Sequence, residues 1–144
     1  MIRNITTNDK ISVSLYLADK LKISLLEASV KTKKIIKSGL PSFILESKDL
    51  RGLCYVELQM IKGVKEKVVV ILCDNWRLAE EYLKILRWNL DGIYWFSLPK
   101  HDFLNRTLNK NGVRFSHVDN DKNIYCYRFE KRVFQNYKSE DNEE

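Results

Sequence analysis

The sequence predicts an α+β protein with a mixed sheet of about six to seven strands and about four helices. Three observations lead to this prediction. An apolar run at 68–73 continues directly into an amphipathic helix, as a buried strand followed by a helix does. Residues 42–73 read as three consecutive strands separated by turn sequences that contain glycine, which is typical of an antiparallel meander. Residues 113–132 read as a closing hairpin.

The first part of the chain is expected to supply one short strand and two helices. Residues 2–6 can form the strand. Residues 11–17 fit either a strand or a helix, and the uninterrupted residues after them favour the helix. Ser24 and Glu27 form a capping box that opens the second helix. Gly39 follows at the position where glycine commonly ends a helix.

The remaining elements alternate between strands and helices. Either Asp74 or Asn75 can cap the helix that follows the apolar run. Because that helix joins two strands of one sheet, we expect the strands on either side of it to be parallel neighbours. The expected strands are 43–46, 53–61, 67–73, 93–98, 113–118 and 124–132, and the expected helices are 75–90 and about 102–109.

Length and composition indicate a single domain at 1–134 with an acidic, flexible tail at 135–144. No apolar run approaches the roughly 20 residues that span a bilayer, so no membrane contact is expected. The N-terminus lacks the layout of a signal peptide, which favours a cytoplasmic protein. The three cysteines stand apart in apolar stretches and are interpreted as buried free thiols: Cys54, Cys73 and Cys126. No metal site is expected.

The charge is unevenly distributed. The net charge is +6, yet four acids and no base lie in residues 139–144, so the preceding chain carries 25 bases against 15 acids. Such a surface can attract weakly bound polyanions, or it can serve solubility alone. The candidate basic face lies on the second helix: Lys31, Lys33, Lys34 and Lys37. Core packing rather than base stacking is expected for the clustered aromatics Trp76, Trp88, Tyr94, Trp95 and Phe96.

Over residues 1–132 the order of elements resembles the GNAT (GCN5-related N-acetyltransferase) fold. The best local match is Phe103-Leu104-Asn105-Arg106-Thr107-Leu108-Asn109-Lys110-Asn111-Gly112-Val113-Arg114-Phe115 with Ile124-Tyr125-Cys126-Tyr127-Arg128, which is similar to the family's closing helix and hairpin. In this family a [RQ]-x-x-G-x-[GA] motif after the fourth strand binds the pyrophosphate of CoA through backbone N–H groups.

The resemblance places that motif on Asp74-Asn75-Trp76-Arg77-Leu78-Ala79, where only Ala79 fits. Asp74 replaces a basic or amide residue, and Arg77 replaces the first glycine. Arg77 can pair with a phosphate directly, or it can stay exposed or pair with Glu80 or Glu81. If CoA binds, the resemblance assigns it to Leu72, Cys73, Asn75, Trp76, Arg77, Leu78 and Ala79.

The catalytic positions of the family also differ here. The tyrosine that serves as its acid corresponds to Leu108, and the fourth strand holds no carboxylate to serve as a base. Glu57, Ser97 and His101 are the substitutes that the sequence offers. Each has a structural alternative: Glu57 can face solvent, Ser97 can end a strand, and His101 can cap the closing helix.

The resemblance therefore implies a GNAT-like protein with a degenerate acetyl-CoA site that works by binding or assembly, with a protein partner or with itself. Structural proteins of tailed phages include short GNAT-like chains, so a virion location is one form of this hypothesis. No cofactor is then expected. The alternative is an active N-acetyltransferase that uses acetyl-CoA and an amine, and a second alternative is a non-specific nucleic-acid-binding module. Whether the chain is an enzyme stays open at this point.

Overall fold

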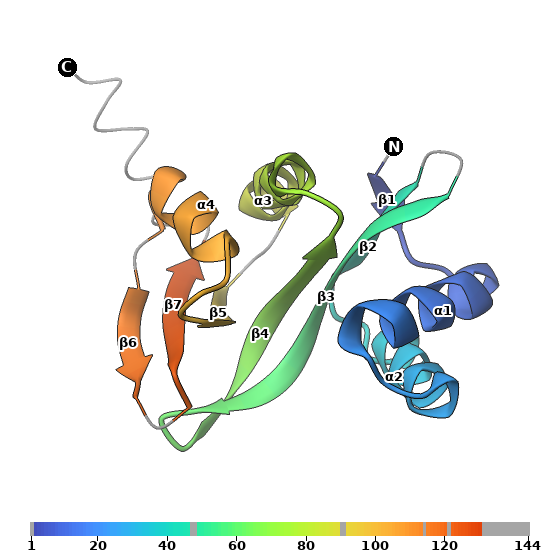
Figure 1. Ribbon diagram of the computed structural model, residues 1–144, viewed down its shortest axis with the longest axis horizontal. Coiled ribbons are helices and arrows are strands. Elements are labelled where there is room, and N and C mark those ends of the chain that lie inside the picture. Colours follow the sequence, from blue (N-terminus) through green and yellow to red (C-terminus); the bar gives the residue numbers. More distant parts are fainter. Residues whose placement is uncertain (1, 47–48, 90–91, 114, 121, 131–144) are drawn as a thin grey trace.

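A computed structural model describes residues 2–46, 49–89, 92–113, 115–120 and 122–130. Its strands form one mixed sheet in the order β1-β2-β3-β4-β5-β7-β6 (Figure 1). The strands are β1 (Ile2–Asn4), β2 (Ser42–Glu46), β3 (Leu50–Ile61), β4 (Val64–Cys73), β5 (Ile93–Pro99), β6 (Phe115–Asp119) and β7 (Ile124–Glu130). The helices are a short 3-10 turn η1 (Thr7–Asp9), α1 (Lys10–Leu21), α2 (Leu25–Lys37), α3 (Trp76–Asn89) and α4 (Leu104–Lys110). The predicted α+β class is confirmed.

Most predicted elements appear with shifted ends. The ambiguous segment 11–17 is helical and belongs to α1, and Ser24 caps α2 by accepting the N–H of Glu27. The first strand is shorter than predicted. β3 begins earlier than predicted, at Leu50. β4 also begins earlier, at Val64, because Lys62 and Gly63 make a two-residue turn with φ of 52° and 76°. The expected tail at 135–144 lies outside the described residues.

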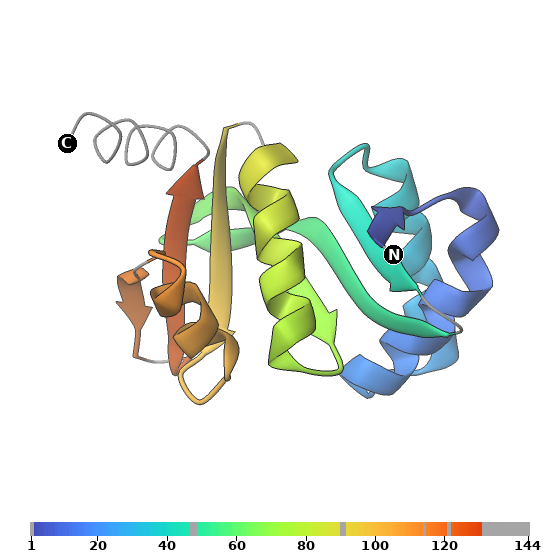
Figure 2. The same ribbon diagram turned by 90° about the horizontal axis from the view of Figure 1, so that it is seen from above.

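Two layers of helix cover opposite faces of the sheet. Successive residues of a strand point to opposite faces. Cys54 and Val56 of β3 pack in a core with side chains of α3 and α4, whereas Leu53 and Tyr55 pack in a core with side chains of α1 and α2. Figure 2 shows α3 lying along the middle of the sheet, with α1 and α2 at the β1–β3 end.

β4 and β5 run parallel, as predicted, but they pair only where Val68 meets Trp95. Beyond that pair each strand keeps a different neighbour. β4 stays paired with β3 up to Cys73, opposite Gly52, and β5 pairs with β7 along its whole length up to Pro99. The carboxyl ends of β4 and β5 therefore point to one end of the molecule but spread apart there (Figure 2). This arrangement places the β4–α3 turn opposite the β5–α4 connection.

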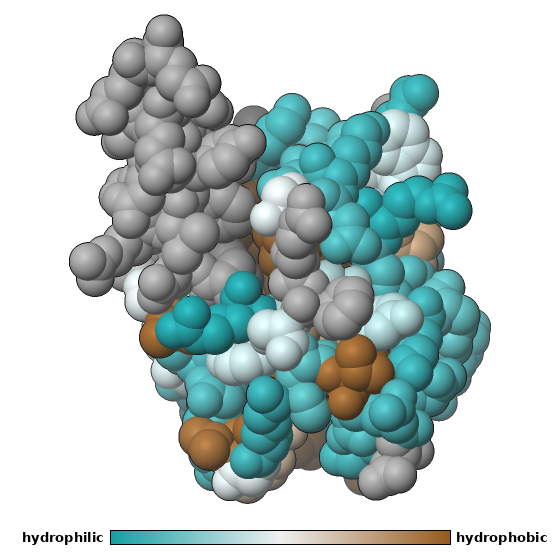
Figure 3. Space-filling model, turned by 90° about the vertical axis from the view of Figure 1, so that its left-hand side faces the viewer, coloured by the Kyte–Doolittle hydropathy of each residue, from teal (hydrophilic) through white to brown (hydrophobic). Residues whose placement is uncertain are grey.

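None of the helices that the structure describes is long and apolar enough to cross a membrane. The side of the molecule formed by β6 and α4 is largely hydrophilic, with separated apolar residues on it (Figure 3).

Candidate functional site

The turn between β4 and α3 is built around Asn75. Its side-chain Oδ1 accepts the backbone N–H of Arg77 at 3.0 Å and that of Leu78 at 3.2 Å. Asn75 is therefore the N-cap of α3, which settles the choice between the two predicted caps. These are N–H groups that a helix would otherwise offer to an anion.

Asp74 turns away from α3 and toward α1. Its carboxylate lies 3.1 Å from Lys20 Nζ and accepts the Tyr16 hydroxyl at 3.3 Å. Tyr16 also donates to the carbonyl of Arg51 at 3.0 Å. Burial and the charge of Asp74 raise the pKa of the Tyr16 phenol, which stays protonated as a donor. Asp74 thus links the turn to α1 while its negative charge is matched by a lysine.

Trp76 and its neighbours form an exposed cation–aromatic cluster. Trp76 is 46% exposed, so its predicted place in the core is wrong. Arg77 lies over the indole with its guanidinium carbon 5.5 Å from the ring centroid, and Lys110 Nζ lies 5.4 Å from the same centroid. Lys110 also pairs with Glu80 at 3.6 Å. Arg77 is exposed, one of the alternatives that the sequence left open.

A cavity of about 870 Å³ lies between this turn and the β5–α4 connection. Its wall combines four basic or histidine side chains with three carboxylates and two exposed aromatic rings. The lining residues are Asp74, Asn75, Trp76, Glu80, Lys100, His101, Asp102, Phe103, Asn105, Arg106, Thr107 and Lys110. Such a wall can hold a ligand that has both an aromatic ring and negative charge.

The β5–α4 side of this cavity is fixed by Asn105, a residue that the sequence did not single out. Its Nδ2 donates to the carbonyls of Pro99 at 2.8 Å and Asp102 at 3.0 Å, and its Oδ1 accepts the buried Tyr127 hydroxyl at 2.6 Å. Asp102 accepts the N–H of Leu104, so Asp102 and not His101 caps the closing helix. Pro99 lies six residues before Asn105 in the sequence, and the contacts between them form only when the β5–α4 connection folds back on itself.

The three catalytic candidates do not converge. Glu57 accepts hydrogen bonds from Lys31 Nζ at 2.9 Å and Gln59 Nε2 at 2.7 Å, and it lines a different cavity from His101. His101 is exposed at the rim of the 870 Å³ cavity. Ser97 lies within β5 opposite Cys126 of β7 and does not end its strand.

Few of the residues assigned to CoA lie on the cavity. Asn75 and Trp76 line it. Ala79 belongs to α3 and is buried in the core that this helix shares with the sheet, and Leu72, Cys73 and Leu78 are half-buried. The Cys73 thiol donates to the carbonyl of Asn75 at 3.2 Å, and burial raises its pKa to about 11. Leu108, at the position of the family's tyrosine acid, is buried in the core with α3.

Comparison with solved structures identifies the fold. A GNAT-family acetyltransferase from Bacillus cereus superposes with a TM-score of 0.71 at 12% identity, covering 91% of this chain and 96% of that one. Aminoglycoside 6′-acetyltransferase type Ii gives a TM-score of 0.71 at 10% identity, with 91% and 97% covered. YncA of Salmonella typhimurium is a proposed acetyltransferase whose structure was determined with its cofactor acetyl-CoA. It superposes with a TM-score of 0.67 at 10% identity, covering 91% of this chain and 93% of that one.

Comparisons with protein-family models and with curated proteins find no match. The predicted GNAT fold is thus confirmed at the level of three-dimensional structure, in a chain that is only 10–12% identical in sequence to these neighbours.

Proposed function

We propose that this GNAT-fold chain carries a degenerate acetyl-CoA site and acts by binding or assembly rather than by acetyl transfer. One observation supports this most directly. The side chain of Asn75 occupies the N–H groups of Arg77 and Leu78 at the start of α3, where enzymes of this fold use free N–H groups to hold a pyrophosphate. A ligand would have to displace that cap, which costs about 1 kcal/mol.

The side chains around the turn support the same proposal. Arg77 places a long side chain where the family has a glycine, and Asp74 keeps a carboxylate next to the phosphate path even though Lys20 pairs with it. Leu108 has no proton to give to a thiolate. Glu57 is held by two hydrogen bonds, so its geometry does not favour the role of a free base.

The 870 Å³ cavity favours a second candidate function, an acetyl-CoA-dependent N-acetyltransferase. The cavity lies at the carboxyl ends of β4 and β5 and offers Lys100, Arg106 and Lys110 to phosphates, with Trp76 and Phe103 beside them for a base. CoA could then bind through side chains instead of backbone N–H groups. The affinity of the chain for acetyl-CoA therefore decides between the two functions.

We expect calorimetry with acetyl-CoA to show weak binding or none for the natural sequence. The double variant Asp74→Gln with Arg77→Gly restores the family's pattern at those two positions and should bind more tightly. The single variant Asp74→Asn is the control, because it removes the negative charge that pairs with Lys20 and keeps the Arg77 side chain.

A dissociation constant at or below about 10 µM for the natural sequence, roughly 7 kcal/mol of binding, would overturn the degenerate site and favour the enzyme. In that case Arg77→Ala should weaken the binding of acetyl-CoA if Arg77 contacts a phosphate directly. It should leave the binding unchanged if Arg77 has only a surface role. Acetyl-CoA should then also raise the melting temperature, since it would stabilise the folded state.

A further inference from the structure

β3 is much longer than the strand beside it, and this leaves part of one edge open. β2 pairs with β3 only up to Ser42, which lies opposite Tyr55. Pro41 precedes Ser42 and has no N–H to continue the ladder. From Val56 to Ile61, β3 pairs with β4 on its other side, and no strand of the described chain pairs with it on the β2 side.

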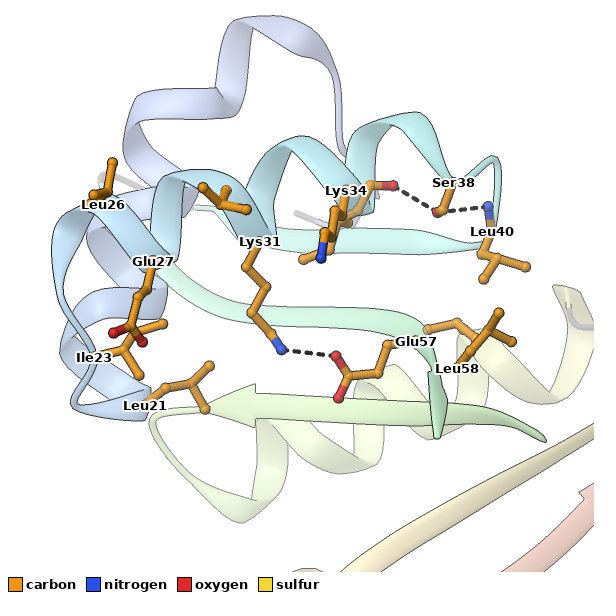
Figure 4. A pocket seen from close by; sticks show the side chains of 13 residues that line it. Leu21, Ile23, Leu26, Glu27, Lys31, Lys34, Ser38, Leu40, Glu57 and Leu58 are labelled. Carbon is orange, nitrogen blue, oxygen red and sulfur yellow. Dashed lines mark hydrogen bonds and ion pairs between the residues drawn. The ribbon is translucent and has the colours of Figure 1, made fainter. Parts of the chain in front are cut away.

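A groove of about 780 Å³ leads along α2 to this open edge. Figure 4 shows Leu21, Ile23, Leu26 and Glu27 at one end of it and Ser38, Leu40 and Leu58 at the other. The remaining lining residues are Val30, Lys31, Lys34, Ile35, Val56 and Glu57. The groove therefore combines one face of α2 with the backbone of β3 at the point where its pairing with β2 stops.

The α2 wall of the groove includes two exposed apolar side chains among its charged residues. Leu26 is 77% exposed and Val30 is 48% exposed, and these residues lie one helical turn apart on the same side of α2. At the strand end, Leu58 is 53% exposed. Covering these side chains would remove apolar surface from water, which stabilises a complex.

The charges of the groove indicate what kind of segment fits. Lys31 and Gln59 both donate hydrogen bonds to the carboxylate of Glu57. The charges of Lys31 and Glu57 are therefore already paired and offer little to a ligand. The side-chain ammonium of Lys34 has no hydrogen bond or ion pair with any residue that the structure describes, although its backbone carbonyl accepts the N–H of Ser38. Glu27 lies two helical turns away at the other end. A carboxylate is therefore complementary at the Lys34 end, next to the open edge.

We propose that this groove is a strand-addition site. One part of an extended segment of another protein pairs with β3 along Val56–Ile61. The next part continues along α2, where its apolar side chains cover Val30 and Leu26 and a carboxylate reaches Lys34. Main-chain hydrogen bonds supply affinity in this mode, and the side-chain pockets supply selectivity. The inference does not depend on whether acetyl-CoA binds, since the groove lies on the α1 and α2 side of the molecule.

The probe is a capped peptide of about twelve residues that alternates valine and glutamate, long enough to cover the open edge and to continue along α2 to Leu26. Its binding to the full chain is measured by fluorescence anisotropy. Leu26→Asp should weaken binding about tenfold or more, because it places a charge in the apolar wall. Leu25→Asp should change it less than about twofold. Leu25 is the preceding residue of the same helix, is 54% exposed and does not line the groove.

A second matched pair tests the charge. Lys34→Glu should weaken binding about tenfold, whereas Lys33→Glu, an equal change of charge just outside the groove, should weaken it less than about twofold. Equal losses in both members of either pair would show non-specific attraction and overturn the proposal. Absence of binding by the natural sequence at about millimolar peptide, a free energy weaker than about 4 kcal/mol, would overturn it as well.

Amide hydrogen exchange tests the strand itself. On binding, amides within Val56–Ile61 that face the open edge should gain protection, and a peptide with a central proline should not bind because it cannot complete the ladder. Binding without this protection would contradict strand addition. Self-association that Leu26→Asp abolishes, with no effect of peptide, would assign the edge to a second copy of this chain instead.

Discussion

Gly52 of β3 lies against the ring of Tyr82, and the lack of a side chain there lets α3 approach the sheet. A β-carbon added to Gly52 would lie 2.9 Å from both Cε2 and the hydroxyl oxygen of Tyr82. Tyr82 is fully buried within the core shared by α3 and the sheet, so its ring has little room to move. Because the side chain of Gly52 is a single hydrogen atom, α3 can pack closely against β3 at this position.

We expect Gly52→Ala to lower the free energy of unfolding by about 1–3 kcal/mol through overpacking. Urea denaturation measures this change. In a Tyr82→Leu background, the ring is gone and the same substitution should cost less, so the two changes should be non-additive. An equal cost of Gly52→Ala in both backgrounds would show that the ring is not what limits this position.

At the scale of elements, one ionic network ties the first strand and the turn after it to the sheet. Asp9 of η1 accepts two hydrogen bonds from Arg3 of β1, at 2.6 and 2.8 Å, and one from the N–H of Thr6 at 2.8 Å. Arg3 also reaches Glu46 of β2 at 2.8 Å. The guanidinium of Arg3 is the main reason that the pKa of Asp9 falls from 3.8 to about 2.

This lowered pKa predicts how stability depends on pH. Because the folded chain holds the ionised carboxylate more strongly than the unfolded chain, the stabilisation is complete above pH 4 or so and is lost as the pH falls toward 2. It amounts to roughly 2 kcal/mol or less. The free energy of unfolding of Asp9→Asn should thus lie below that of the natural sequence at pH 6, and the gap should narrow by pH 2.5. A gap that stays constant would contradict the lowered pKa.

At the scale of the whole molecule, the excess of positive charge is presented partly by α2. Lys33, Lys34 and Lys37 are exposed and lie within about 100° around the helix. Lys31 is not part of this basic face, because its ammonium group pairs with Glu57 and lies over the ring of Tyr55. The basic face is thus smaller than the four lysines suggested, and the acidic residues 139–144 lie outside the described part of the chain.

We therefore expect only weak, non-specific binding of duplex DNA. Its affinity should fall with salt with a slope near 0.9 per phosphate contacted, which means about 3 for three lysines. Lys33→Glu and Lys37→Glu should each weaken the binding, Lys31→Ala should not, and deletion of residues 139–144 should strengthen it. Sequence-selective binding that persists at physiological salt would contradict this expectation.

The sequence by itself determined the elements and their order. Ser24 with Glu27 located the start of α2, the apolar run at 68–73 located β4, and the helix after it required a parallel neighbour. These features depend on caps, side-chain periodicity and connection rules, which act within a few residues of the chain. The resemblance to the GNAT fold rested on this order, and for that reason it held despite identities near 10%.

Only the tertiary structure decided what individual side chains do. Asp74 pairs with Lys20 and Tyr16, which lie more than fifty residues earlier, and Glu57 pairs with Lys31 because α2 crosses over β3. Trp76 is exposed because it begins α3 beyond the part of the sheet that the helix covers. The open edge of β3 likewise follows from register between strands. Periodicity fixes which face of an element is apolar, but the partner of a polar or edge group is set by packing across the fold.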